Sequence, residues 1–420
     1  MRRHRASIVP LAAVSAATAL GLAACGTTTA NTSLTANASK PITVGISLPL
    51  TGASAADGQA TRNGYELWAS DVNRNGGLLG RQVKLVIVDD KDNPNVIASQ
   101  YKTLIQTDHV QLTLAPFSTL LTVPAEGATR SLGYALAGGA ATGPLVYQAN
   151  DPLMFSVSTP DQAEMQPFAN WVTSLPGPNR PKTAAYPMVN DPFADPPVQA
   201  TQTYLQSHGI RTVYSINPNN APQSTSTGAL ARMAATVAND HPDAVVLGSV
   251  DLPTLLTFVR AFQSANYTPR IFIAASGPDQ GQAFLNTLGR NSAEAMMVPD
   301  GWYGQEQNAL SHVMVQDYIA KFGGTSSDIN ADVAEAYASG EVLADAVTAT
   351  HSFKGSVLAQ YLHTHTLQTA EGPAFFNSVG ENTDAINSAF IFQWQNGHFF
   401  QELPNRGPGA PLIEAVKPHW

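Results

Sequence analysis

The stretch ITVGISLPLTG at residues 42–52 is an apolar, strand-like run that ends in a turn. A segment with the period of a helix follows over residues 58–75, and Gly76 and Gly77 suit the end of that helix. A second apolar run, VKLVIV at residues 83–88, leads into two aspartates. This order predicts two neighbouring parallel strands joined by a right-handed crossover. In open α/β sheets, ligands bind at the edge where the carboxyl ends of the strands meet.

The same alternation continues through most of the chain. From residue 182 a second series of helix-period segments and apolar runs predicts a second parallel sheet. Near the end, Asn396-Gly397 is a strong hairpin signal between two short apolar runs, 390–394 and 398–400. The other strands predicted after residue 90 are 110–115, 134–138, 154–157, 182–189, 212–216, 244–248, 270–275 and 296–298, and the helices are 95–107, 119–131, 194–207, 225–240, 252–265, 307–322 and 328–350.

The amino terminus has the layout of a secretory signal. A basic segment at residues 1–5 precedes an alanine-rich apolar run that ends in Leu-Ala-Ala before Cys25. This ending resembles a bacterial lipoprotein box, which implies cleavage after residue 24 and lipid attachment to Cys25; the alternative is an ordinary signal peptide. The polar residues 25–40 would form a flexible tether. We therefore expect an exported protein, anchored by acyl chains at the outer face of the cytoplasmic membrane.

Size and charge narrow the function classes. The roughly 380 residues after the leader exceed one ordinary domain, so two cores are expected. The formal charge of the chain is −9, and it becomes −12 when Arg2, Arg3 and Arg5 leave with the leader. An acidic protein without a basic stripe is not expected to bind nucleic acid.

The motifs give little support to an enzyme. Gly76-Gly77-x-x-Gly80 precedes a strand, whereas a dinucleotide-binding loop follows one. The chain has neither a P-loop nor a Gly-x-Ser-x-Gly motif, and His363 and His365 lack a third ligand at a useful spacing. We therefore expect no enzymatic activity, no cofactor and no metal site.

Four features of the first unit occur together in a known family. They are Leu-Pro-Leu-Thr-Gly at residues 48–52, Asn-Gly-x-Glu at 63–66, Asp-Val-Asn-x-x-Gly-Gly-x-x-Gly at 71–80, and the Asp-Asp that ends the second strand. In this order they resemble the branched-chain amino acid type of ABC-transporter substrate-binding protein, and the resemblance extends over residues 42–400. It implies the type I periplasmic binding protein fold, with two doubly wound parallel-sheet lobes.

The resemblance also implies how the lobes are connected. The N-terminal lobe would comprise residues 41–157 and 302–388, and the C-terminal lobe residues 158–301 and 389–420. Three crossovers between them would form a hinge, which lets the lobes close around a small-molecule ligand. The implied partners are that ligand and the membrane subunits of an ABC permease.

One candidate site begins at the end of the third predicted strand, where Phe117, Ser118 and Thr119 precede a helix. Unpaired N–H groups at a helix start can hold an anion, and either hydroxyl can donate to a ligand or only cap the helix. Phe117 is a candidate for the apolar lining.

A second candidate stretch follows the fourth strand, where Gly138 and Gly139 precede Ala140, Ala141 and Thr142. Its small residues allow close approach of the backbone. The resemblance implies that Ala-Ala-Thr contributes main-chain and hydroxyl contacts to the charged groups of an amino acid; a turn without a ligand is the alternative.

The second lobe contributes two candidates through the resemblance. Phe193 stands where the family often has a tyrosine that covers the ligand, and packing in the core is the alternative. Gly277-Pro278-Asp279 matches a family Gly-Pro-Glu whose carboxylate meets the ligand ammonium, although Asp279 is one methylene shorter and could simply cap a turn or helix.

Two further residues are candidates from their position. Asp57 follows the first strand and can face the cleft or cap the next helix. Trp302 follows the second predicted crossing and can form an aromatic wall or pack near the hinge. The expected function is capture of a small amino acid or related carboxylate for transport. A sensor domain that signals through a membrane partner is the alternative.

Overall fold

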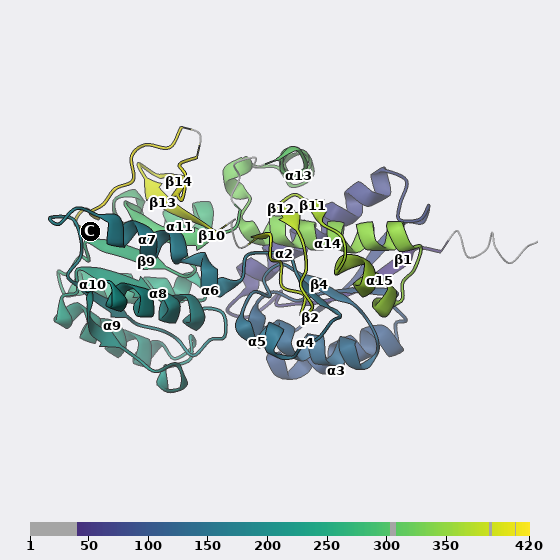
Figure 1. Ribbon diagram of the computed structural model, residues 1–420, viewed down its shortest axis with the longest axis horizontal. Coiled ribbons are helices and arrows are strands. Elements are labelled where there is room, and N and C mark those ends of the chain that lie inside the picture. Colours follow the sequence, from purple (N-terminus) through teal and green to yellow (C-terminus); the bar gives the residue numbers. More distant parts are fainter. Residues whose placement is uncertain (1–39, 303–307, 386–388, 408) are drawn as a thin grey trace, which may run out of the picture. The chain divides into compact units, whose positions relative to one another are not determined.

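The computed structural model describes residues 40–302, 308–385, 389–407 and 409–420, which fold around two β-sheets (Figure 1). The predicted leader and Cys25 lie outside these residues, as does nearly all of the predicted tether. None of the helices in the described residues is long and apolar enough to cross a membrane.

The first sheet has five strands, all parallel, in the order β2-β1-β3-β4-β5. The first of them, β1, is nearly continuous in apolar residues because helices cover both faces of the sheet. The strands are β1 (Ile42–Leu48), β2 (Val83–Asp89), β3 (Leu112–Leu114), β4 (Leu136–Gly138) and β5 (Met154–Ser156).

Two clusters of buried side chains hold helices to this first sheet. One cluster joins it to α2, α13, α14 and α15, and the other joins it to α3, α4 and α5. A short antiparallel pair, β11 (Leu367–Thr369) and β12 (Gly372–Ala374), follows α15. The helices are α2 (Ala55–Arg74), α3 (Pro94–Gln106), α4 (Thr119–Ser131), α5 (Pro144–Gln148), α13 (Ala309–Phe322), α14 (Ala331–Thr350) and α15 (Gly355–Leu362).

Helix α14 brings the late part of the chain back against α2. A Cβ atom at Gly64 of α2 would lie 2.3 Å from the Val333 carbonyl oxygen, and one at Gly340 would lie 2.3 Å from the Trp68 ring. Both glycines therefore allow a close approach that a larger residue would prevent. This contact places the first turn of α14 beside the amino-terminal part of the chain.

The second sheet has seven strands in the order β14-β13-β10-β9-β8-β6-β7. Strands β6 to β10 run parallel, whereas β13 is antiparallel to both β10 and β14. The strands are β6 (Thr183–Tyr186), β7 (Arg211–Ser215), β8 (Ala244–Leu247), β9 (Ile271–Ala274), β10 (Met296–Asp300), β13 (Phe390–Gln395) and β14 (His398–Leu403).

A third buried cluster joins this second sheet to its helices. The chain also forms two 3₁₀ turns, η1 (Pro218–Asn220) after β7 and η2 (Ser326–Asp328) after α13. The helices are α6 (Asp161–Glu164), α7 (Gln166–Ser174), α8 (Asp195–Ser207), α9 (Thr227–Asp240), α10 (Leu252–Ser264), α11 (Gly281–Leu288) and α12 (Arg290–Ala293).

The predicted α/β class with two largely parallel sheets is confirmed. The predicted hairpin is present, and both Asn396 and Gly397 have positive φ angles, 54° and 77°, as its two-residue turn requires. The short elements α5, α6, α7, α11, α12, α15, β11 and β12 were not predicted, since segments of three to nine residues show too little period to be recognised.

Candidate ligand-binding site

A pocket with a cavity volume of about 350 Å³ lies where the loops after several strands converge. Its wall includes Ser54 after β1, Ser118 after β3, Thr142 after β4 and Ser276 after β9. The pocket therefore occupies the carboxyl edge at which the sequence predicted a site. Its volume is at the small end of the range for ligand pockets, which suits a metabolite rather than a large molecule.

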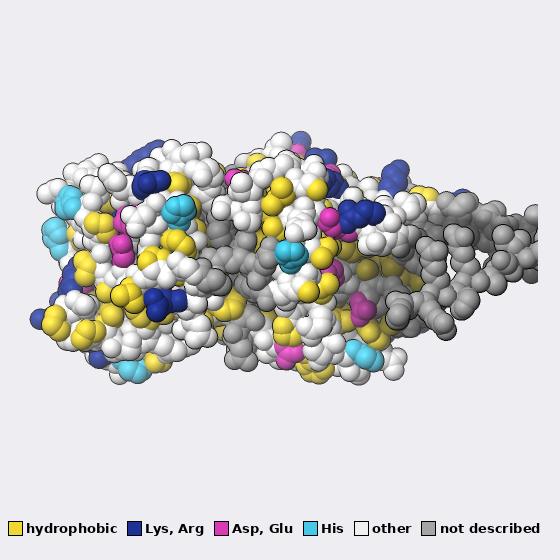
Figure 2. Space-filling view, turned by 90° about the horizontal axis from the view of Figure 1, so that it is seen from above, with side chains coloured by type: hydrophobic (Ala, Val, Ile, Leu, Met, Phe, Trp, Pro, Cys, Tyr) yellow, Lys and Arg dark blue, Asp and Glu magenta, His cyan; other side chains and the backbone are white. Residues whose placement is uncertain are grey.

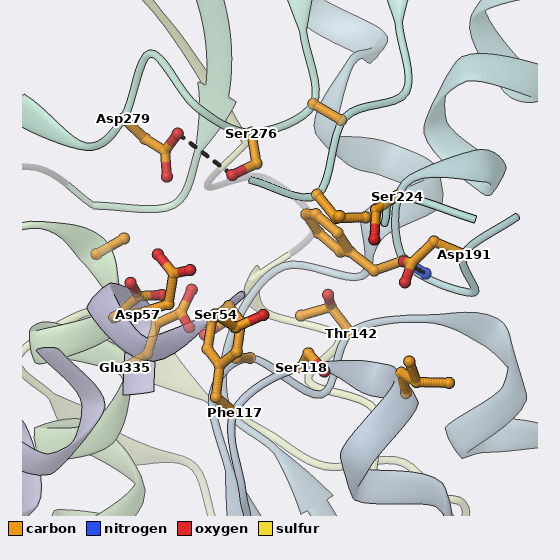
Figure 3. Close-up of a pocket in the computed structure, with 18 of the residues that line it drawn as sticks. Ser54, Asp57, Phe117, Ser118, Thr142, Asp191, Ser224, Ser276, Asp279 and Glu335 are labelled. Carbon is orange, nitrogen blue, oxygen red and sulfur yellow. Dashed lines mark hydrogen bonds between the residues drawn. The ribbon is translucent and has the colours of Figure 1, made fainter. Parts of the chain in front are cut away.

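One wall is the start of α4. The Ser118 hydroxyl accepts a hydrogen bond from the Leu121 N–H at 3.4 Å and so caps the helix. Ser118 has φ 71° and ψ 155°, a conformation that non-glycine residues rarely adopt and that costs roughly 1–3 kcal/mol. Such strain persists only where the surroundings impose it, and here it holds Ser118 at the pocket edge, next to Thr142 (Figure 3). The first N–H groups of α4 face outward from the helix start, where anions bind well.

The stretch after β4 contributes Ala140 and Thr142 to the wall, but not Ala141. Ala141 is fully buried in the cluster shared by α3, α4 and α5. Thr119 is also fully buried outside the wall, and its hydroxyl accepts a hydrogen bond from the Gly143 N–H at 2.9 Å. These two predicted site residues therefore support the wall from behind rather than line it, because their side chains point into the core.

Asp279 lines the opposite side of the pocket. Its Oδ1 accepts the Gly277 N–H at 2.5 Å and the Ser276 hydroxyl at 3.5 Å, so the aspartate closes its own turn (Figure 3). Its Oδ2 is 3.4 Å from the Gln280 side-chain nitrogen. Burial raises the pKa of Asp279, and the hydrogen bond from Gly277 acts against that shift.

Asp57 lies in the first turn of α2, because that helix begins three residues earlier than predicted. Its Oδ1 accepts a hydrogen bond from the Gln280 side chain at 2.5 Å. Burial, followed by the nearby Asp279 carboxylate, raises the pKa of Asp57. The first turn of α2 and the loop after β9 thus meet in this pocket through one carboxylate and one amide.

Of the three aromatic candidates, two line the pocket and one does not. Phe117 and Phe193 line the pocket, and Phe193 also packs against the core of the second sheet. Trp302 does not line it. The Trp302 ring is fully buried in the first-sheet core, where its Nε1 donates to the Ser311 hydroxyl at 2.8 Å. Its role is packing, the alternative that the sequence left open.

The wall also contains acidic residues that sequence reasoning missed. Glu164 belongs to α6, Asp300 ends β10, and Asp332 and Glu335 belong to the first turns of α14. The spacing of Asp332 and Glu335, three residues apart on one helix face, was a usable signal. Nothing in the sequence alone showed that the first turn of α14 reaches this pocket.

Burial is the main cause of the raised pKa values of these carboxyl groups. It raises the pKa of Glu164 to about 8, with further contributions from the Glu335 and Asp279 carboxylates. Burial also raises the pKa of Asp300, Asp332 and Glu335, and in each case neighbouring carboxylates add to the shift. The groups therefore raise one another's pKa values, which shows that they share one environment.

The two histidines considered as metal ligands in the sequence make contacts with neighbouring protein groups. The His363 Nε2 is 2.9 Å from the Pro152 carbonyl oxygen, and His365 stacks on Tyr361. No group of three or more His, Cys, Asp or Glu side chains in the described part of the chain has the arrangement of a metal site. On the face shown in Figure 2, the described Lys and Arg side chains are scattered, and some of them lie beside Asp or Glu.

Comparisons with known proteins agree with this fold. A family model described as periplasmic binding protein matches residues 41–398. An amino acid binding protein of Pseudomonas aeruginosa is 21% identical over 376 residues, which cover 88% of this chain and 95% of that protein. The Leu/Ile/Val-binding protein BraC3 of Rhizobium johnstonii is 29% identical over 103 residues, 24% of this chain and 28% of that protein.

Solved structures give the same picture of the fold. The leucine-binding protein LivK of Thermotoga maritima superposes with a TM-score of 0.73 at 17% identity, covering 86% of this chain and 97% of that one. LivJ of Streptococcus pneumoniae, in complex with isoleucine, has a TM-score of 0.70 at 18% identity, with 88% and 99% covered. A solute-binding protein of R. palustris in complex with benzoate has a TM-score of 0.70 at 16% identity, with 90% and 100% covered.

The names of these solved structures mention different ligands. At such low sequence identity, structural similarity establishes the fold and not the ligand. The family predicted from the motifs of the first unit is confirmed, since the family model spans all but the ends of the chain. The chain therefore belongs to the periplasmic binding protein family.

Proposed function

We propose that this protein captures a small α-amino acid in the pocket between the two sheets and delivers it to an ABC permease. One observation carries the proposal. The pocket joins an anion-favouring helix start, with the Ser118 and Thr142 hydroxyls, to a carboxylate wall that includes Asp279. An α-amino acid has the matching pair of charges, a carboxylate for the first and an ammonium for the second.

The expected binding free energy is large enough for a transport protein. Hydrogen bonds to charged groups contribute roughly 1.5–3 kcal/mol each, and a dissociation constant of 1 μM corresponds to about 8 kcal/mol. Several such bonds, together with apolar contact to Phe117 and Phe193, would reach that range after the costs of ordering the site. The names of the relatives, an amino acid binding protein and a Leu/Ile/Val-binding protein, support the same ligand class.

The remaining parts of the proposal come from the sequence. The leader at residues 1–24 would direct export, and acyl chains on Cys25 would hold the mature protein at the outer face of the membrane. Residues 41–157 with 302–388, and 158–301 with 389–420, would act as the two lobes that close on the ligand. Binding would then shift the protein toward the closed form, which is the form presented to the permease.

Thermal stabilisation by a ligand panel tests the proposal. The panel contains α-amino acids, their amides, short carboxylic acids and aromatic acids. A ligand at a hundredfold excess over its dissociation constant stabilises the folded state by about 2.7 kcal/mol. We expect α-amino acids to raise the melting temperature, and the shift to fall in Asp279→Asn. Stabilisation by aromatic acids alone would contradict the proposal while leaving the family intact.

A further inference from the structure

The pocket is far more acidic than recognition of one ammonium requires. Two of the carboxyl side chains in its wall, Asp92 and Asp191, belong to local loop structure. The other six come from five separate segments of the chain. We call these six the carboxylate cluster: Asp57, Glu164, Asp279, Asp300, Asp332 and Glu335.

The two outlying carboxylates are explained by local structure. Asp191 accepts hydrogen bonds from the Phe193 and Ala194 N–H groups just before α8, at 2.8 and 3.1 Å. Asp92 accepts from the backbone and hydroxyl of Ser54, both at 3.2 Å. These aspartates organise loops, so their presence in the wall does not by itself indicate a ligand.

The carboxylate cluster is explained less well by its own contacts. Asp279 accepts hydrogen bonds from the Gly277 N–H and the Ser276 hydroxyl, and its second oxygen shares the amide of Gln280 with Asp57. Within the described chain, Asp300 accepts a 3.2 Å bond from the Trp302 N–H, and Asp332 a 2.9 Å bond from the Asn330 side chain. All of these donors are neutral groups.

The described wall of the pocket offers the cluster no basic side chain. Among the described residues, the pocket wall contains no Lys, Arg or His. The internal segments outside the described ranges read YGQEQ at 303–307, INS at 386–388 and a single proline at 408, so they supply no basic residue either. The ion pairs of the described chain involve Arg62 and Arg74, which bind carboxylates of α2 and α13 outside the wall.

The members of the cluster are close enough to affect one another. The Asp279 carboxylate raises the pKa of Asp57, Glu164 and Glu335 alike. In Figure 3, Asp57, Asp279 and Glu335 project toward a common space on one side of Phe117, whereas Ser118 and Thr142 lie on its other side. A buried group of like charges without a counter-charge is unfavourable, so this space is suited to cations supplied by a ligand.

The raised pKa values, about 8 for Asp57 and Glu164, show that part of the cluster holds protons when no cation is near. A single ammonium would let few of the six groups ionise, whereas a second cationic group would let more of them do so. A divalent metal ion is an alternative source of charge, but no three acidic groups among the described residues have the arrangement of a metal site. Phe117 lies between the cluster and the helix start, and its ring offers apolar contact to a methylene chain that connects two polar ends.

We propose that the ligand is an α-amino acid with a second cationic group at the end of its side chain. Its α-carboxylate meets Ser118 and Thr142 at the start of α4, and both of its cationic groups face the carboxylate cluster. This inference rests on the proposed function and narrows it from amino acids in general to basic ones. The cluster selects such a ligand over a neutral amino acid of equal size, because only the basic one reduces the repulsion twice.

Isothermal titration calorimetry on the full-length protein tests this selection. The probes are L-lysine, L-norleucine, L-leucine, 1,5-diaminopentane and CaCl₂, at pH 7.5 and low salt. Norleucine has the same carbon chain as lysine and lacks only the terminal ammonium. We expect lysine to bind at least tenfold more tightly than norleucine, and the preference to shrink as salt concentration rises.

A variant pair assigns the effect to the cluster. Glu335→Gln removes one carboxylate from the pocket, and Glu341→Gln makes the same change on the same helix outside the wall. We expect Glu335→Gln to reduce lysine affinity at least fivefold more than norleucine affinity, and Glu341→Gln to leave the ratio unchanged. A ratio that moves equally in both variants would overturn the assignment.

The other outcomes separate this inference from the proposed function. Leucine or norleucine binding as tightly as lysine would overturn the second cationic subsite and leave amino acid binding intact. Tighter binding of 1,5-diaminopentane than of lysine would overturn the role of the α-carboxylate, and with it the amino acid class. Binding of CaCl₂ that blocks lysine would make the cluster a metal site instead. Binding of no probe would overturn both proposals.

Discussion

The Gln280 side-chain amide donates a 2.5 Å hydrogen bond to the Asp57 carboxylate. Asp57 belongs to α2 beside the first sheet, and Gln280 immediately precedes α11 beside the second. The two residues are 223 positions apart, so this bond joins distant parts of the chain at the pocket. It also supplies the neutral donor that keeps the buried Asp57 satisfied where no basic side chain of the described wall is available.

Replacing Gln280 with leucine is expected to lower the free energy of unfolding by about 1–3 kcal/mol, since a buried carboxylate loses its donor. The hydrogen bond from Gln280 lowers the pKa of Asp57, so the variant should also titrate Asp57 at higher pH. Urea unfolding at pH 8 measures the loss. Gln282→Leu is the control, because Gln282 lies two residues further on, in α11, and bonds only the exposed Asn286. Equal losses in the two variants would contradict this account.

Removing both hydroxyls with Ser118→Ala and Thr142→Ala is expected to weaken amino acid binding more than tenfold. Each hydroxyl would donate to the ligand carboxylate, and a bond to a charged group is worth roughly 1.5–3 kcal/mol. Calorimetry measures the change. Ser131→Ala, at the other end of α4, is the control, since its hydroxyl bonds only the Ala128 carbonyl oxygen. Unchanged affinity in the double variant would exclude these two residues from the site.

Glycine substitutions test the close approach of α14 to the pocket. A Cβ atom at Gly139 would lie 2.2 Å from the Glu335 Cβ, so Gly139→Ala should displace the acidic wall and destabilise the protein by about 1–3 kcal/mol. In Gly127→Ala, within α4, the new methyl group meets no atom within 4 Å and should stabilise the protein by roughly 0.4–1 kcal/mol. Thermal unfolding of both variants measures the effects. The same sign in both would contradict the described packing.

The protein without ligand should lose stability as pH rises from 5 to 7. Burial raises the pKa of Glu164 to about 8, and the pKa values of Asp57 and Glu335 also rise above those of the unfolded chain. In this window the folded state therefore holds protons that the unfolded state has released, and stability falls with pH. Above pH 7 the buried Lys417, whose pKa falls to about 7, acts in the opposite direction. The melting temperature should be higher at pH 5 than at pH 7, and Glu164→Gln should reduce that difference. A melting temperature that rises from pH 5 to 7 would contradict the burial of these carboxyl groups.

Much of the fold could be predicted because its long elements carry strong periods. The unit over residues 42–90 showed its strands, its crossover helix and its turn glycines, and Asn396-Gly397 marked the hairpin. The boundaries were less certain. Helix α2 starts at Ala55, whereas the predicted start was residue 58. The start was hard to predict because the helix has no side-chain cap: Ser54 precedes it without making a capping hydrogen bond. This shift moved Asp57 from a loop into the first helical turn.

The site could be predicted only where it followed a strand. Ser118, Thr142 and Asp279 lie in the loops that follow strands, within five residues of each strand end, and their placement in one pocket follows from the sheet order. Asp332 and Glu335 come from a helix that returns from the other end of the chain, so their contribution depends on the packing of α14 against α2. Sequence patterns do not encode such tertiary contacts, and for this reason the acidity of the pocket became visible only in the structure.

The most direct test of the account is a calorimetric comparison of one amino acid with its own blocked forms. The probe is the amino acid that stabilises the protein most, measured beside its Nα-acetyl derivative and its α-amide. If the pocket recognises the ammonium through its carboxylates and the carboxylate through the start of α4, acetylation should weaken binding at least a hundredfold and amidation at least tenfold. An acetylated ligand that binds as tightly as the free amino acid would contradict the central claim.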